Sequence, residues 1–212
     1  MTVTIYLVRH AESLSNVTGN GNFHDPELTT RGHRESAALG AKLSRDLDRI
    51  DMIFASPMQR AIQTALGAFP DYMDEIILLP ELQERGGTPC APCDIGSPPD
   101  LLLSQYGAAH FDYSHMTLDW TDKGPGSFYA PSNAPARARS VRRLIREVTK
   151  PFEGMDACVV VVTHGRFLQF LTESDVIYGN AEARPYVFAV ANEGDTEARL
   201  IPAFSNDADS LF

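Results

Sequence analysis

One segment of the chain, Ala157-Cys158-Val159-Val160-Val161-Val162, restricts the fold more than any other. It is apolar without polar alternation and rich in β-branched residues, which is typical of a strand buried on both faces. Val3-Thr4-Ile5-Tyr6-Leu7-Val8 has a similar character. Because parallel sheets are usually covered by helices on both faces, the two runs predict an α/β fold.

Other short apolar runs alternate with segments of helical periodicity. In the last long helical segment, Val141, Leu144, Ile145 and Val148 recur at the spacing of one helix face. This alternation predicts a three-layer α/β/α fold with a mostly parallel sheet. Further strands are expected over residues 52–55, 76–79, 186–191 and 200–204, and helices from Thr29 or Thr30 to about 47 and over 58–68, 133–150 and 166–172.

The length of 212 residues and the hydrophobic content of 43% are sufficient for a single domain over residues 1–212. Residues 86–132 form an irregular insertion rich in Gly, Pro and aromatic residues, with one short helix expected over 99–106. We expect it to act as a lid that selects substrates. The tail, 205–212, lacks periodicity and is expected to be flexible.

The formal net charge of −10 disfavours nucleic acid and anionic membranes as partners, so any anion site must be locally basic. The N-terminus shows neither a basic leader nor a long apolar segment, and three cysteines are an odd number. We therefore expect a cytoplasmic protein. Cys90 and Cys93 are interpreted as loop residues, with a redox pair or a zinc site as the alternative. A monomer and a homodimer both remain open.

Chemically versatile side chains follow four of the expected strands. Arg9 and His10 end the first strand, and the second and third lead to Arg60 and Glu84. The valine strand leads to His164. Ligands of such sheets bind beyond the carboxyl ends of the strands. These side chains are therefore expected to converge on one site.

This set of side chains suits phosphoryl transfer. A neutral imidazole such as His10 is nucleophilic near pH 7, and the forks of Arg9 and Arg60 match phosphate oxygens. His164 can donate to the transferring group, and Glu84 can protonate the departing oxygen and later accept a proton from water. The two arginines would repel a divalent cation. We therefore expect no metal and no cofactor.

Four ordered motifs resemble those of the histidine phosphatase superfamily, in its phosphoglycerate mutase-like branch 1. A segment from Asp25 to Gly32 also resembles the one that opens the first helix of that family. The resemblance spans roughly residues 3–172, and the insertion matches only loosely. The four motifs are Arg9-His10-Ala11-Glu12-Ser13 with Asn16 beyond it, Ser56-Pro57-Met58-Gln59-Arg60-Ala61-Ile62-Gln63-Thr64-Ala65, Leu82-Gln83-Glu84 and Thr163-His164-Gly165.

The resemblance implies a phosphoglycerate mutase-like fold in which His10 is the phosphorylated nucleophile and Glu84 is the proton donor. Ala11 departs from the family pattern, which has Gly after the nucleophile, and the added methyl group disfavours a positive φ. Glu12 and Glu81 remain alternative acids. The phosphoryl group would be bound by Arg9, Asn16, Arg60 and His164.

The leading hypothesis is a phosphatase that hydrolyses a small phosphorylated metabolite through a phosphohistidine intermediate. A repurposed fold is the alternative, either a ligand-binding pseudoenzyme or an acid–base catalyst acting on a substrate without phosphate. A phosphoglycerate mutase is less favoured, because Glu84-Arg85-Gly86-Gly87-Thr88 lacks the mutase sequence of the resembled family. Candidate lid residues that could select the substrate are Arg85, Tyr113, Trp120 and Lys123.

Overall fold

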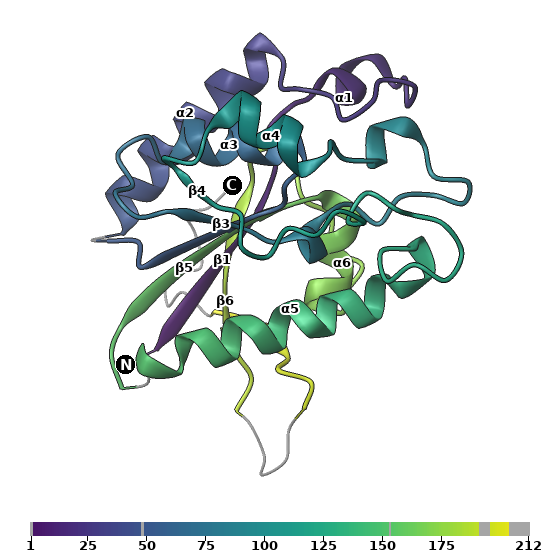
Figure 1. The fold of residues 1–212 in the computed structure, drawn as a ribbon. Helices are drawn as coiled ribbons and strands as arrows, with labels where there is room; N and C mark the ends of the chain where they lie inside the picture. The colour runs from purple at the N-terminus through teal and green to yellow at the C-terminus, as the bar shows by residue number, and fades with distance from the viewer. Residues whose placement is uncertain (1, 48, 153, 191–195, 204–212) are drawn as a thin grey trace.

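The structure, a computed structural model, describes residues 2–47, 49–152, 154–190 and 196–203. Its centre is a seven-stranded sheet of order β4-β3-β2-β5-β1-β6-β7 (Figure 1). The pairs from β4 to β1 are parallel, and β6 and β7 run antiparallel at one edge. The strands are β1 (Val3–Arg9), β2 (Met52–Ala55), β3 (Ile76–Leu78), β4 (Phe111–Asp112), β5 (Ala157–Thr163), β6 (Ala183–Phe188) and β7 (Leu200–Pro202).

The pairing of β1 with β5 places the two strands predicted to be most buried side by side. Every residue of β5 is buried, as its valine-rich sequence predicted. The two strands run parallel, and their last residues, Arg9 and Thr163, lie opposite each other. Because both strands end at the same edge of the sheet, the residues that follow them, His10 and His164, are brought together.

Helices cover both faces of the sheet, which confirms the predicted three-layer α/β/α fold. Helices α2 (Thr30–Asp46) and α3 (Gln59–Ala68) pack on one face, and α5 (Ala134–Thr149) and α6 (Gly165–Thr172) on the other (Figure 1). The valines of β5 alternate between the two apolar clusters that lie on the two faces of the sheet. Val160 and Val162 belong to the first apolar cluster, and Val159 and Val161 belong to the second.

Local signals place the ends of several helices. The side chain of Thr29 accepts a hydrogen bond from the backbone N–H of Gly32 at 3.0 Å and so caps the start of α2. Helix α4 (Pro99–Tyr106) has the predicted bounds and begins with a proline, as helix first turns often do. No helix among the described residues is both long and apolar enough to traverse a lipid bilayer.

Some elements differ from those predicted. Helix α1 (Leu14–Thr18) was not predicted, and β4 has only two residues, too few to show a sequence pattern. Strand β6 begins three residues earlier than predicted, because its N-terminal half pairs with β1. The expected flexible tail, 205–212, and the ends of two expected strands, 191 and 204, lie outside the described residues.

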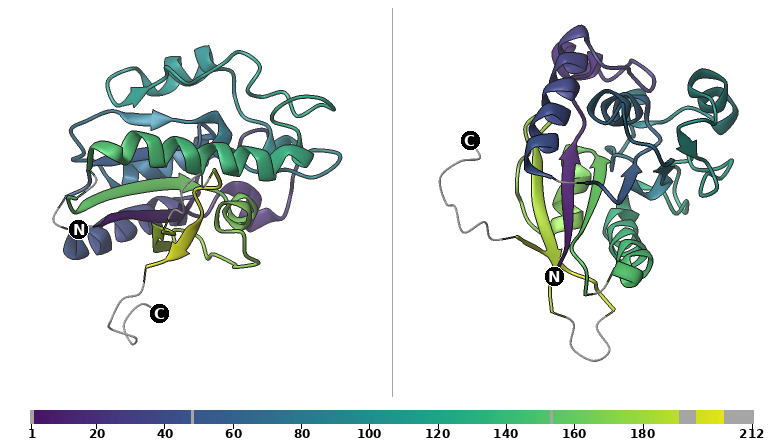
Figure 2. Two further views of the ribbon diagram at one scale, coloured as in Figure 1. Left: turned by 90° about the horizontal axis from the view of Figure 1, so that it is seen from below. Right: turned by 90° about the vertical axis from the view of Figure 1, so that its left-hand side faces the viewer.

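The insertion, residues 86–132, contacts the first turns of α3 and supplies the edge strand β4, and in Figure 2 it lies at the periphery of the molecule. It carries η2 (Pro92–Asp94), α4 and β4, and it contributes buried residues such as Leu102, Phe111 and Trp120 to the first core cluster. The insertion is therefore part of the packed structure. The other short 3-10 helices are η1 (Pro80–Leu82), η3 (Pro131–Asn133) and η4 (Lys150–Phe152).

Candidate active site

A cavity of about 460 Å³ lies beyond the carboxyl ends of the central strands. Its size suits a small molecule. The cavity is lined by residues that are far apart in the sequence, from the end of β1, from α1, α3 and α6, and from η2. Its lining residues include Arg9, His10, Ser15, Asn16, Arg60, Glu84, Cys93, Asp94, Arg166, Gln169, Ile177 and Tyr178.

His10 is held in one tautomer by two hydrogen bonds. Its Nε2 receives a hydrogen bond from Nε of Arg60 at 3.3 Å, and its Nδ1 lies 2.7 Å from the carbonyl oxygen of Ala11. Arginine has no acceptor, so Nε2 must be the acceptor and Nδ1 must carry the proton that is donated to Ala11. Burial lowers the pKa of His10 well below its usual range, and the positive charge of Arg60 lowers it further. The imidazole is therefore neutral near pH 7.

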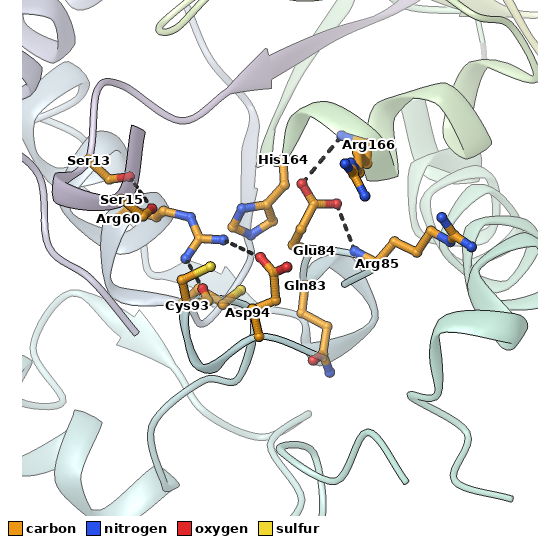
Figure 3. Close-up of polar contacts among 12 residues, drawn as sticks. Ser13, Ser15, Arg60, Gln83, Glu84, Arg85, Cys93, Asp94, His164 and Arg166 are labelled. Atoms are coloured by element: carbon orange, nitrogen blue, oxygen red, sulfur yellow. Dashed lines mark hydrogen bonds and ion pairs between the residues drawn. The ribbon is translucent and has the colours of Figure 1, made fainter. Parts of the chain in front are cut away.

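Arg60 reaches three partners from the start of α3. Besides His10, it donates from Nη1 to the carbonyl oxygen of Cys93 at 2.8 Å, and its Nη2 lies 3.5 Å from a carboxylate oxygen of Asp94 (Figure 3). The side chain is almost completely buried. The guanidinium is thus oriented beside the nucleophilic nitrogen, and it also forms an ion pair with Asp94.

His164 is the second buried imidazole of the site. Its ring centre lies 5.1 Å from that of His10, and its Nε2 lies 2.8 Å from the hydroxyl oxygen of Ser56. The other nitrogen, Nδ1, is buried and finds no partner among the described residues. Burial lowers the pKa of His164 well below its usual range, with Arg60 contributing further. His164 itself is not among the residues that line the cavity, whereas its neighbour Gly165 is.

Arg9 and Asn16 also line the cavity, and they come from β1 and α1. Arg9 donates from Nη1 to the carbonyl oxygen of Tyr178 at 2.6 Å, and its buried Nε has no partner among the described residues. The Oδ1 of Asn16 accepts from the N–H of Ser13, the hydroxyl of Ser13 and the amide of Asn180. Since Oδ1 is occupied by these donors, the amide N–H₂ of Asn16 is the group left for the cavity.

Glu84 is fixed by backbone contacts on the far side of His164 from Arg60 (Figure 3). One carboxylate oxygen accepts from the N–H of Arg85 at 2.7 Å, and the other accepts from the N–H of Arg166 at 3.3 Å. The carbonyl oxygen of Glu84 accepts from Nζ of Lys123 at 2.6 Å. The carboxylate thus has a defined position at the wall of the cavity.

Two cations from other parts of the chain hold the loop that carries Glu84. Arg137 of α5 is fully buried and donates to the carbonyl oxygens of Glu81 and Gln83, each at 2.9 Å. Burial, together with the positive charge of Arg137, lowers the pKa of Lys123 to about 7. The loop is therefore positioned by tertiary contacts that its own sequence does not reveal.

Ala11 is accommodated without a strained backbone. It is fully buried, and it is not among the described residues that have a positive φ. Its N–H donates to the hydroxyl oxygen of Thr64 at 3.0 Å, and that hydroxyl donates to the carbonyl oxygen of Arg60 at 2.6 Å. The added methyl group therefore occupies the core beside α3.

Comparison with known proteins places this site in a family. The sequence profile described as the histidine phosphatase superfamily (branch 1) matches residues 5–184, which include all the residues of the site named above. The chain belongs to this superfamily. The resemblance drawn from the four ordered motifs is thereby confirmed.

Curated relatives of this histidine phosphatase superfamily member include two proteins of Schizosaccharomyces pombe, each named as a probable phosphatase. One is 32% identical over 117 residues, which is 52% of this chain and 52% of the relative. The other is 31% identical over 175 residues, which is 79% of this chain and 55% of the relative. The chain spans about half the length of these relatives.

Solved structures of low sequence identity share the fold. The phosphoserine phosphatase of Entamoeba histolytica is 18% identical, with a TM-score of 0.59 and coverage of 99% of this chain and 100% of that one. YhfR of Bacillus stearothermophilus is 20% identical, with a TM-score of 0.62 and the same two coverages of 99% and 100%. At this identity the likeness concerns the fold alone, and it confirms the expected phosphoglycerate mutase-like architecture.

Within this superfamily member, the four candidate lid residues lie away from the cavity wall, as far as the described residues show. Trp120 is fully buried in the first core cluster, because the insertion closes over it. The hydroxyl of Tyr113 donates to the carbonyl oxygen of Gly107 at 3.0 Å, within the insertion. Arg85 extends over the ring of Phe170, and Lys123 holds Glu84.

The structure also separates the three carboxylates considered as the acid. Glu12 accepts from the hydroxyl of Thr29 at 2.7 Å and lies 3.6 Å from the guanidinium of Arg31. Neither Glu12 nor Glu81 lines the cavity, whereas Glu84 does. Glu84 is thus the carboxylate that reaches the site from the expected loop.

The sequence did not indicate several of the cavity residues, among them Ser15, Gln169, Ile177 and Tyr178. Arg166 lies two residues after His164, so inspection of the residues following each strand could have found it. Cys93 and Asp94 belong to the irregular insertion, where no pattern indicated a contact with Arg60. Among the described residues, no group of three or more His, Cys, Asp or Glu side chains is arranged to hold a metal ion.

Proposed function

We propose that the protein is a phosphatase that hydrolyses a small phosphorylated metabolite through a phosphohistidine intermediate on His10. One observation carries this proposal. Nδ1 of His10 donates to the carbonyl of Ala11, so the lone pair of Nε2 lies on the side of Arg60 and the cavity. A neutral, oriented imidazole beside a guanidinium is suited to attack a phosphoryl group and to stabilise its charge.

In the first step, the Nε–H of Arg60 turns from Nε2 of His10 to a phosphoryl oxygen and Nε2 attacks phosphorus, so that the N–P bond forms and the bond from phosphorus to the alcohol oxygen breaks. Arg9, Arg60 and the amide of Asn16, which line the cavity, bind the phosphoryl oxygens. His164, which lies behind the cavity wall beside His10, supports the charge of the site. Glu84, in its protonated form, donates a proton to the departing oxygen. The alcohol leaves and the phosphoryl group remains on His10.

In the second step, a water molecule attacks the phosphohistidine. Glu84, now ionised, accepts a proton from that water, the O–P bond forms and the N–P bond breaks. Orthophosphate leaves, and His10 returns to its neutral form with the proton still on Nδ1. No metal or cofactor takes part in either step as proposed.

The names of relatives support the same activity. The two Schizosaccharomyces pombe relatives are named as probable phosphatases, and the Entamoeba histolytica structure is named as a phosphoserine phosphatase. Relatives named as phosphoglycerate mutases also match, over shorter stretches. We infer hydrolysis rather than isomerisation, because the loop after Glu84 lacks the mutase sequence.

The deciding experiment compares wild type with His10→Ala and with His33→Ala, an exposed histidine of α2, in the hydrolysis of a generic aryl phosphate. Wild type and His33→Ala should release phosphate, and rapid quenching should trap an acid-labile, alkali-stable phosphoryl group on both. His10→Ala should show neither signal. Equal phosphate release from wild type and His10→Ala would overturn the proposal.

The role of Glu84 has its own test. With an aryl leaving group that needs little protonation, Glu84→Gln should slow the hydrolysis of phosphohistidine more than its formation, so that the phosphoenzyme accumulates after a burst. With an alkyl ester, kcat should fall roughly 10²- to 10⁴-fold, as expected on loss of a general acid. Glu81→Gln, from the same loop but away from the cavity, is the matched control.

The alternative of a repurposed fold rests on the unusual insertion and on Ala11, which is not among the described residues with a positive φ. It predicts no phosphohistidine with any of a range of phosphate esters, whereas a ligand would still bind. Robust isomerisation of phosphoglycerate would instead identify a mutase. Either outcome is distinct from the phosphate release expected of a phosphatase.

A further inference from the structure

The two ends of the cavity differ in the groups they offer to a ligand. Arg60 and Cys93 lie on one side of the His164 ring, and Glu84 and Arg166 lie on the other (Figure 3). This inference rests on the proposed function, in which Glu84 protonates the departing oxygen. The leaving alcohol must then lie on the side of Glu84.

Arg166 provides a charge on that side. Its backbone N–H holds the carboxylate of Glu84, while its side chain is exposed and lines the cavity. The guanidinium makes no hydrogen bond and no ion pair within the described part of the chain. Most other arginines near the site already have partners, such as Tyr178 for Arg9 and Asp94 for Arg60. The fork of Arg166 is available to a ligand.

Gln169 extends the same surface. It lies three residues after Arg166 on α6, so the two side chains occupy one face of the helix. Gln169 also lines the cavity, and its side-chain amide makes no hydrogen bond to any described residue. Ile177, which is 79% exposed, lines the cavity as well and offers an apolar contact. A planar cation next to an amide suits a carboxylate or a phosphate.

We propose that Arg166 and Gln169 form a specificity subsite for a second anionic group on the leaving alcohol. The preferred substrates are accordingly phosphate esters whose alcohol carries a carboxylate or a second phosphate. The phosphoryl group is held at Arg9 and Arg60, and the second anion is held at the guanidinium of Arg166. The overall charge of −10 makes such a local cationic surface important for attracting an anion.

The test uses four esters of similar length whose leaving alcohols differ in charge. They are ethyl phosphate, phosphoethanolamine, phosphoglycolate and ethane-1,2-diyl bisphosphate. Wild type should show the highest kcat/KM for phosphoglycolate, for ethane-1,2-diyl bisphosphate or for both. The ester with the higher value shows whether the subsite prefers a carboxylate or a phosphate. Preference for phosphoethanolamine or for ethyl phosphate would overturn the inference.

The variants are Arg166→Ala, Arg166→Lys and Arg85→Ala. Arg166→Ala should lower the ratio of kcat/KM for the anionic ester to that for ethyl phosphate about 10- to 100-fold, the usual effect of losing a charged hydrogen bond. Arg166→Lys should restore part of this ratio, because it keeps the charge but not the fork. Arg85→Ala should leave the ratio as in wild type, since Arg85 lies over Phe170 outside the cavity lining.

Two further readouts separate this inference from the proposed function. In wild type, the ratio of kcat/KM for the anionic ester to that for ethyl phosphate should decrease as salt is raised from 0.05 to 0.5 M, because the charge of an exposed guanidinium is screened by salt. Binding of the four esters to His10→Ala, measured by calorimetry, reports the subsite without turnover. Failure of hydrolysis with intact binding selectivity would overturn the proposed function alone. An unchanged ratio and unchanged binding in Arg166→Ala would overturn the subsite alone.

Discussion

The Nε of Arg60 donates a hydrogen bond to Nε2 of His10 at 3.3 Å, and this contact orders the candidate active site. It determines which imidazole nitrogen carries a lone pair, and it places a permanent positive charge beside that nitrogen. The same guanidinium also contacts Cys93 and Asp94. Arg60 therefore links the nucleophile to the insertion.

The first prediction concerns the geometry of this arginine. Arg60→Lys keeps a positive charge but loses the planar fork, so kcat/KM for an aryl phosphate should fall about 10²-fold, and Arg60→Ala should lower it further. Steady-state kinetics and the yield of phosphohistidine measure the effect. Arg34→Ala, an exposed arginine of α2, should retain wild-type activity. Near-normal turnover by Arg60→Ala would show that this contact is unimportant.

The second prediction concerns Asp94, whose carboxylate lies 3.5 Å from Nη2 of Arg60 and lines the cavity. It competes with phosphate for the guanidinium and repels a bound anion. Asp94→Asn should therefore tighten competitive inhibition by inorganic phosphate roughly 3- to 10-fold, as expected for loss of one nearby like charge. Asp100→Asn, on the exposed side of the insertion, serves as the control. Weaker inhibition would indicate that Asp94 orients Arg60 instead.

The third prediction concerns the packing of the insertion. A Cβ added at Gly96 would lie 1.9 Å from an atom of the Trp120 ring, so Gly96→Ala cannot be accommodated without movement. It should lower the free energy of unfolding by about 1–3 kcal/mol, the usual cost of overpacking. In the background of Trp120→Leu the same change should cost less, which a double-mutant cycle by urea denaturation would detect. Additive effects would contradict the packing described.

The fourth prediction concerns acid stability. The pKa values of His10 and His164 are both lowered well below 6.5 by burial, so below pH 6.5 the unfolded chain binds protons that the folded chain excludes. The contribution of these two histidines to the free energy of unfolding should be constant above pH 6.5. Below pH 6.5 the free energy of unfolding should decrease by up to about 1.4 kcal/mol per pH unit for each histidine. Denaturation of wild type and of His10→Asn between pH 5 and 7 measures the slope. The variant should show a shallower decrease, and an equal slope would contradict the burial argument.

The sequence was sufficient to predict the three layers of the fold and the main residues of the candidate site. Two strands with continuous apolar character had to be buried, and their parallel arrangement brought His10 and His164 to one edge. Periodicity also placed α3 and α5 within one residue of their observed starts. These predictions depended on local patterns, which a strand or a helix carries within its own residues.

The sequence was not sufficient for the insertion. Its aromatic residues indicated a lid, but burial of Trp120 depends on contacts with residues distant in the chain. The approach of Asp94 to Arg60 likewise depends on how η2 lies against the start of α3. Irregular segments have no period, so nothing local indicates which side chains reach the cavity.

The sequence by itself determined that an imidazole, two arginines and a second histidine would meet at the carboxyl edge of a buried parallel sheet. Only the tertiary structure decided which nitrogen of His10 is unprotonated, which carboxylate lines the cavity and which guanidinium of the cavity has no partner among the described residues. The positions and burial of the strands follow from local hydrophobic patterns, whereas hydrogen-bond partners follow from distances between segments that are remote in the chain.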